Sequence, residues 1–164
     1  MGKATPISAA VRRQLWRDPL HLIACGFGLG MSPWMPGTCG TVLGVLIAWG
    51  LSYTPLWSAI GVCIVLGLVG VFLCERTNRL LKTDDHPMVV WDEVAAFPIV
   101  MLGIPFTGAW PWIGFVVFRV LDIWKPWPIR WCDQQVHGGL GVMLDDWVAA
   151  VIGWVIVFIM HQLV

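Results

Sequence analysis

The chain has 164 residues, of which 58% are hydrophobic and 12% are charged, against roughly 25% charged residues in soluble domains. Its mean hydropathy is +0.77, and 10 basic and 10 acidic residues give a net charge of zero at pH 7. This composition indicates an integral membrane protein with a single domain over residues 1–164, and the balanced charge gives no reason to expect a nucleic-acid partner.

The first 18 residues are polar and carry four basic side chains, so we expect a cytoplasmic segment and no cleaved secretory signal. The block His21–Thr41 follows and contains five glycines, spaced for close approach of the backbone. It is neither a GxGxxG motif nor a P-loop. Two interpretations stay open: a tightly packed re-entrant element, or a phosphate-lining loop that uses hydroxyls such as those of Ser32 and Thr38.

The charge-free stretch Pro19–Cys74 is too long for one membrane helix, which needs about 20 apolar residues. The turn signal at Tyr53–Pro55 divides this stretch. We therefore predict a short helix near Thr38–Ser52 and a longer helix near Leu56–Arg79.

The next charge-free stretch, Val94–Phe118, has two interpretations. As one span it would place Glu93 and Arg119 on opposite faces of the bilayer, whereas a short hairpin turning around Gly103–Pro111 returns both to one face. The hairpin puts all ten basic residues on one side, and the single span divides them seven and three. Because basic residues concentrate on the cytoplasmic side of membrane proteins, the charges favour the hairpin.

The last apolar run predicts a helix from about Leu144 to His161. The expected fold is therefore all-α and polytopic, with about five membrane helices, two of which form the short hairpin. The charged face would be cytoplasmic, and the C-terminus would face outward.

The segment Phe118–Asp146 carries seven charged residues in an otherwise apolar protein. Charges beside membrane helices are costly and usually belong to a working site. If Trp110–Trp124 is helical, Arg119 and Asp122 lie on one face and Lys125 completes the next turn. A salt bridge at a helix end, with side chains that snorkel to the interface, is the simpler alternative.

Two acidic pairs precede apolar runs: Asp92 with Glu93, and Asp145 with Asp146. Capping of a helix N-terminus alone would explain one acidic residue, but two adjacent carboxylates exceed that need. Mg²⁺ prefers carboxylate oxygens together with water and substrate phosphate, so we expect these acids near such an ion. The glycine-rich segment Gly138–Gly141 is predicted to be a flexible turn whose backbone N–H groups could donate to phosphate oxygens.

Four segments in this order carry a family likeness: GFGLGMSPWMPGTCGT, VVWDEV, FRVLDIWKPWPIRWCD and GGLGVMLDD. Together they resemble the phosphatidylglycerophosphatase A family, from about His21 to Gly153. The resemblance implies a multi-pass lipid phosphatase of the bacterial inner membrane that depends on Mg²⁺ and faces the cytoplasm. Its substrate would be phosphatidylglycerophosphate, and its products phosphatidylglycerol and inorganic phosphate.

The resemblance also assigns the charged residues to family motifs. The acidic WDE-type pair, the FRxxDxxKP motif and the terminal DD correspond to Asp92 and Glu93, to Arg119, Asp122 and Lys125, and to Asp145 and Asp146. As a hypothesis, the four residues of the two acidic pairs share Mg²⁺.

In this hypothesis Arg119 and Lys125 bind the phosphoryl oxygens, and Asp122 orients these cations or binds the metal. Further phosphate contacts are expected from Ser32, Thr38 and Arg130. Attack by water and a phosphoaspartyl intermediate both stay open.

Other functional classes predict different patterns. The motifs of CDP-alcohol phosphotransferases and of membrane phosphatases with a histidine nucleophile are absent. A small transporter subunit would place charges near the middle of its spans, and a non-catalytic lipid-binding scaffold would tolerate the loss of Asp146.

Overall fold

A computed structural model describes residues 8–164, and these residues form helices and connecting turns without any β-strand. The elements are α1 (Ala9–Arg17), α2 (Pro19–Ala24), the 3₁₀ segment η1 (Gly26–Met31), α3 (Pro36–Leu51), α4 (Leu56–Leu81), α5 (Trp91–Val100), α6 (Trp110–Trp124), α7 (Ile129–Gln135) and α8 (Gly138–Gln162). The all-α prediction is confirmed. Residues 1–7 of the expected polar N-terminal segment lie outside the described residues, and its remainder contains α1.

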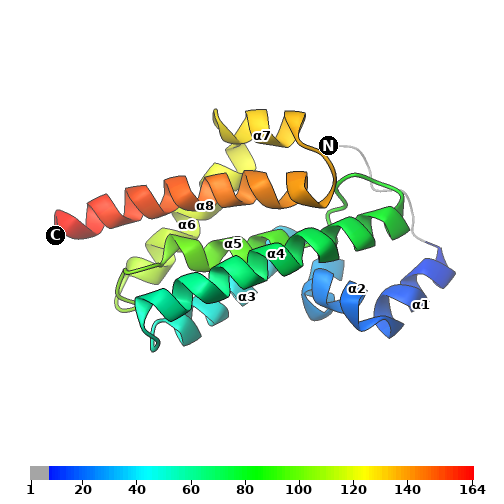
Figure 1. Ribbon diagram of the computed structural model, residues 1–164, viewed down its shortest axis with the longest axis horizontal. Coiled ribbons are helices and arrows are strands. Elements are labelled where there is room, and N and C mark those ends of the chain that lie inside the picture. Colours follow the sequence, from blue (N-terminus) through cyan, green and yellow to red (C-terminus); the bar gives the residue numbers. More distant parts are fainter. Residues whose placement is uncertain (1–7) are drawn as a thin grey trace.

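Helix α5 is the centre of the bundle. It packs against α3, α4, α6 and α8, and the long helices α4 and α8 run beside it in Figure 1. Its sequence is apolar around most of its circumference, as expected of a helix enclosed by other helices. The exceptions are Asp92 and Glu93 in its first turn. The fold therefore places two carboxyl groups against the core at one end of the bundle.

That end collects the starts of α3, α5 and α8 and the ends of α4 and α6. In Figure 1 it lies toward α1 and α2, whereas the α3–α4 turn, the α5–α6 turn and the C-terminus lie at the opposite end. A guanidinium nitrogen of Arg119 is 3.7 Å from the Glu93 carboxylate. The segment between them is thus a hairpin, and the single-span interpretation is wrong.

Two helices, α4 with 26 residues and α8 with 25, are long and apolar enough to cross a membrane. Helix α3 has 16 residues and α5 has 10, or about 24 Å and 15 Å at 1.5 Å per residue, short of a hydrocarbon core of about 30 Å. The chain is therefore a helical, membrane-associated protein, and the expectation of about five spans stays a prediction.

The last helix begins six residues before the predicted start. The segment Gly138–Gly141 forms its first turn, so the prediction of a flexible turn is wrong. The backbone N–H groups of a helix start need acceptors, and the Glu75 carboxylate of α4 accepts from the N–H of Gly139. As a result Asp145 and Asp146 lie two turns inside α8, where they cannot act as its caps.

Helix α3 packs closely on α5 through glycines. A Cβ atom added to Gly44 would lie 2.8 Å from the Cβ of Phe97 and 3.1 Å from two carbonyl oxygens of α5. Gly40 lies four residues earlier and meets Val90 equally closely. This small-xxx-small spacing lets two helix backbones approach each other, and it sets the distance between α3 and the acidic start of α5.

The substitution Gly44→Ala should therefore lower the melting temperature by several degrees, because α3 must move away from α5. Gly50→Ala is the matched control on the same helix, since nothing lies within 4 Å of a Cβ atom at that position. Thermal unfolding in detergent measures both. Equal melting temperatures for the two variants would contradict the packing role of Gly44.

Candidate active site

An open cavity of about 360 Å³ lies at the end of the bundle where α5 starts, lined by residues of α3, α5, α6 and α8 and of the loop before α5. All seven charged residues of the three motifs line it, together with eight other residues. The full lining is Met35, Pro36, Gly37, Asp85, Pro87, Val89, Asp92, Glu93, Arg119, Asp122, Ile123, Lys125, Val142, Asp145 and Asp146. The fold thus brings together charges that are up to 54 residues apart in sequence, from Asp92 to Asp146.

Three carboxyl groups form a tight cluster in this cavity. One oxygen from each of Asp92, Glu93 and Asp146 lies within 4.8 Å of the other two. Asp92 is 9% exposed and Asp146 is 3% exposed. Each of the three has a buried oxygen without a hydrogen-bond partner: Oδ1 of Asp92, Oε2 of Glu93 and Oδ2 of Asp146. Buried carboxylate oxygens without partners are costly, so the cluster fits a cation with oxygen ligands.

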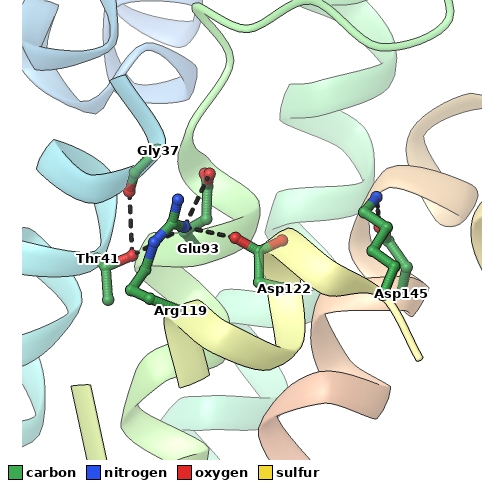
Figure 2. Close-up of polar contacts among 7 residues, drawn as sticks. Gly37, Thr41, Glu93, Arg119, Asp122 and Asp145 are labelled. Atoms are coloured by element: carbon green, nitrogen blue, oxygen red, sulfur yellow. Dashed lines mark hydrogen bonds and ion pairs between the residues drawn. The ribbon is translucent and has the colours of Figure 1, made fainter. Parts of the chain in front are cut away.

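Arg119 lies between α6 and α3 (Figure 2). Its Nη1 forms an ion pair with Asp122 on the next turn, as the spacing predicts, and lies 3.7 Å from Glu93. It also donates to the hydroxyl of Thr41 at 3.4 Å. The Thr41 side chain is fully buried and donates in turn to the carbonyl of Gly37 at 3.0 Å. Arg119 is therefore held from three sides, which fixes its position at the cavity.

Gly37 is required by this arrangement. A Cβ atom at Gly37 would lie 2.1 Å from an oxygen of Glu93 and 3.3 Å from Nη1 of Arg119. Any larger residue would push these two charged groups away from the start of α3.

Lys125 occupies a different place from the one expected. It ends α6 in a left-handed conformation, with φ at 44°, so its side chain does not continue the stripe of Arg119 and Asp122. Its ammonium group instead pairs with Asp133 and Asp145 (Figure 2 shows Asp145 in its ion pair). Asp133 lies on helix α7, which was not predicted from the sequence, and α7 places its carboxylate beside the ammonium group of Lys125.

These two carboxylates determine the charge state of Lys125. Burial alone would lower the pKa of the ammonium group, but the charge of Asp145 and the hydrogen bonds to Asp133 and Asp145 outweigh burial and raise the pKa above its ordinary value. The ammonium group thus stays charged at neutral pH. Asp145 is consequently neutralised by Lys125, whereas Glu93 of the cluster shares Arg119 with Asp122.

Three other predicted residues do not line the cavity. The hydroxyl of Ser32 hydrogen bonds to the backbone of Trp34. Arg130 is exposed on α7, and Thr38, in the first turn of α3, has a buried hydroxyl without a partner. The glycine-rich η1 segment packs against the chain before α5, where a Cβ at Gly30 would lie 2.2 Å from the carbonyl oxygen of Met88. This supports the packing interpretation of that block.

Sequence reasoning passed over Thr41 and Asp85 as site residues. In the sequence, Thr41 is one of several hydroxyl residues in a glycine-rich block, and Asp85 is one of several acidic residues in the segment before α5. No local spacing showed that Thr41 would meet a residue 78 positions away.

Comparison with known proteins shows the family of the chain. The family model of phosphatidylglycerophosphatase A matches residues 22–161. The chain belongs to the phosphatidylglycerophosphatase A family. It is 44% identical over 149 residues to the Escherichia coli protein named phosphatidylglycerophosphatase A, covering 88% of this chain and 86% of that relative. The Haemophilus influenzae protein of the same name is 38% identical over 149 residues, covering 86% and 88%. No solved structure matches the chain.

The matched region of this phosphatidylglycerophosphatase A family member contains the whole cavity. Every residue of the lining falls between positions 35 and 146, inside the matched range of 22–161. The family resemblance expected from the motifs is thereby confirmed.

Removing the charge of Lys125 should destabilise the fold, because the buried carboxylate of Asp145 would lose its cationic partner. We expect Lys125→Met to lower the stability by roughly 1–3 kcal/mol, the cost of leaving a buried polar group unpaired. Thermal or denaturant unfolding checks this value. Arg130→Met is the control: Arg130 is an exposed cation only five residues away, and its loss should shift the midpoint little. Equal shifts in the two variants would contradict the pairing described above.

Proposed function

We propose that this protein hydrolyses the terminal phosphomonoester of phosphatidylglycerophosphate to give phosphatidylglycerol and inorganic phosphate. The observation that carries the proposal is the composition of one cavity, which holds three carboxyl groups with unpartnered oxygens beside two cationic side chains. The two relatives named above carry the name of this activity.

Magnesium is the metal that we propose for the site. Asp92, Glu93 and Asp146 would hold it, since their free oxygens are close together and Mg²⁺ takes oxygen ligands. Asp145 stands next to this set. Its Oδ2 pairs with Lys125, and its Oδ1 is buried without a hydrogen-bond partner, so Asp145 could contribute this oxygen and keep its ion pair. When bound, the ion would supply Lewis-acid stabilisation of the charge on the phosphoryl and leaving oxygens.

Arg119 and Lys125 would bind the phosphate. A phosphate monoester carries close to two negative charges near neutral pH, and its transition state spreads charge over the phosphoryl oxygens. Donors that are already in place stabilise such charge without reorganisation. Arg119 meets this condition because Asp122 and Thr41 hold its guanidinium, and its Nε is buried without a partner.

We propose that water attacks the phosphorus directly. Asp122 and Asp145 are both engaged by cations, and the clustered carboxyl groups of Asp92, Glu93 and Asp146 are better suited to a shared cation than to nucleophilic attack. In this route Asp122 positions Arg119 and does not form a covalent bond.

The proposed location is the cytoplasmic face of the bacterial inner membrane, in a multi-pass arrangement. The charged end of the bundle would lie at the interface, where a lipid presents its phosphorylated headgroup while its acyl chains stay in the bilayer. The gathering of charges at one end also favours an enzyme over a transporter subunit, for which mid-span charges are expected.

Phosphate release from phosphatidylglycerophosphate by the purified protein in detergent should require Mg²⁺ and stop with EDTA. Asp146→Asn should lower kcat about a hundredfold, the scale of losing a major electrostatic contribution. Asp84→Asn, which changes an exposed acid in the loop before α5, should retain activity. Full activity of Asp146→Asn would exclude Asp146 from the site, and activity in EDTA would exclude the proposed metal. No phosphate release by the folded wild-type protein would support the scaffold alternative.

The nucleophile can be tested with substrate carrying ³²P in its terminal phosphate. Acid quenching during turnover should leave no label on the protein, because no phosphoenzyme forms when water attacks directly. Acid-stable label that hydroxylamine removes would identify an acyl phosphate and contradict direct attack.

A further inference from the structure

Two exposed apolar side chains line the charged cavity. Met35 is 63% exposed and Ile123 is 59% exposed. Met35 directly precedes α3, and Ile123 lies near the end of α6. Between these helices Arg119 reaches from α6 to Thr41 of α3 (Figure 2). The cavity therefore has charged groups within and two large apolar side chains on its exposed rim.

The backbone at Met35 is unfavourable for a side chain. Its φ is 47°, in the left-handed region that glycine or asparagine adopts more readily. A methionine there contributes little to the core because most of it is exposed. Strained backbone of this kind at the edge of a cavity is consistent with a contact to a ligand.

The size of the cavity limits what can enter it. Ligand pockets for whole drug-sized molecules measure about 300–1,000 Å³, and this cavity of about 360 Å³ is near the lower limit. It can take a phosphorylated glycerol headgroup but not two acyl chains as well. The chains must leave the cavity across an apolar edge.

We propose that Met35 and Ile123 form a lateral opening for the lipid substrate, with its glycerol and first acyl carbons between these two side chains. This inference rests on the proposed function and deepens it. The phosphate then lies on Arg119 and Lys125, and the acyl chains stay in the bilayer outside α3 and α6. The opening contributes to recognition of a diacylglycerol body in addition to a phosphomonoester.

The test measures hydrolysis in mixed micelles of a long-chain phosphatidylglycerophosphate and of its dihexanoyl analogue, by the full-length protein with Mg²⁺. Ile123→Ser and Met35→Asn should each raise KM for the long-chain lipid about fivefold with little change in kcat, because the lost apolar contact acts in substrate binding. The preference for the long-chain over the short-chain substrate should fall by a similar factor. Asparagine is chosen at position 35 because it tolerates the left-handed backbone.

Ile64→Ser is the matched control. Ile64 has the same side chain and is 57% exposed, but it lies on α4 and does not line the cavity. If Ile64→Ser and Ile123→Ser raise KM equally, or if the loss in Ile123→Ser is confined to kcat, the lateral opening is wrong while the proposed function stands. A folded wild-type protein that is inactive on both substrates would overturn the proposed function and this inference with it.

Discussion

The burial of three carboxyl groups at one end of an apolar bundle is the constraint on which the other features of the site depend. Two unit charges about 4 Å apart interact by about 4 kcal/mol at an effective dielectric constant of about 20. The oxygens of Asp92, Glu93 and Asp146 lie within 4.8 Å of one another, so their mutual repulsion is comparable to much of a domain's net stability of roughly 5–15 kcal/mol. Protonation or a nearby cation must offset it.

The cations of the protein offset this repulsion only in part. Of the three clustered carboxyl groups, Arg119 pairs with that of Glu93, at 3.7 Å, but its contact with Asp122 is shorter. Lys125 is engaged by Asp133 and Asp145. A divalent ion would convert the repulsion into ligation, which explains why the proposed metal and the proposed phosphate site share one cavity. The glycines of α3 contribute to this site, because they let α3 and Arg119 approach the start of α5.

Much of this site could be predicted from the sequence because charges are rare in the chain. In an apolar protein, charged residues are expected at a helix end or in a functional cavity. The charged residues of all three motifs line one cavity. The helix Trp110–Trp124 and the pairing of Arg119 with Asp122 followed from 3.6-residue periodicity and the proline at position 126. The chemistry itself was indicated by the family resemblance, not by spacing.

The remaining features depend on contacts that are distant in sequence. Helix α8 begins early because Glu75, 64 residues before Gly139, accepts a hydrogen bond from its first turn. The direction of the Lys125 side chain depends on the left-handed backbone conformation of Lys125 itself, which its motif does not indicate. Ser32 and Arg130 were chosen for their chemistry alone, and nothing local in the sequence indicated where their side chains would lie.

The most direct test of the three-carboxylate site is Mn²⁺ binding to the purified protein, followed by electron paramagnetic resonance as free Mn²⁺ disappears on titration. The account predicts that Mn²⁺ binds, that Mg²⁺ displaces it, and that Asp92→Asn or Asp146→Asn weakens binding at least tenfold while Asp84→Asn does not. Binding that is equally strong in wild type and in both cluster variants would contradict the central claim.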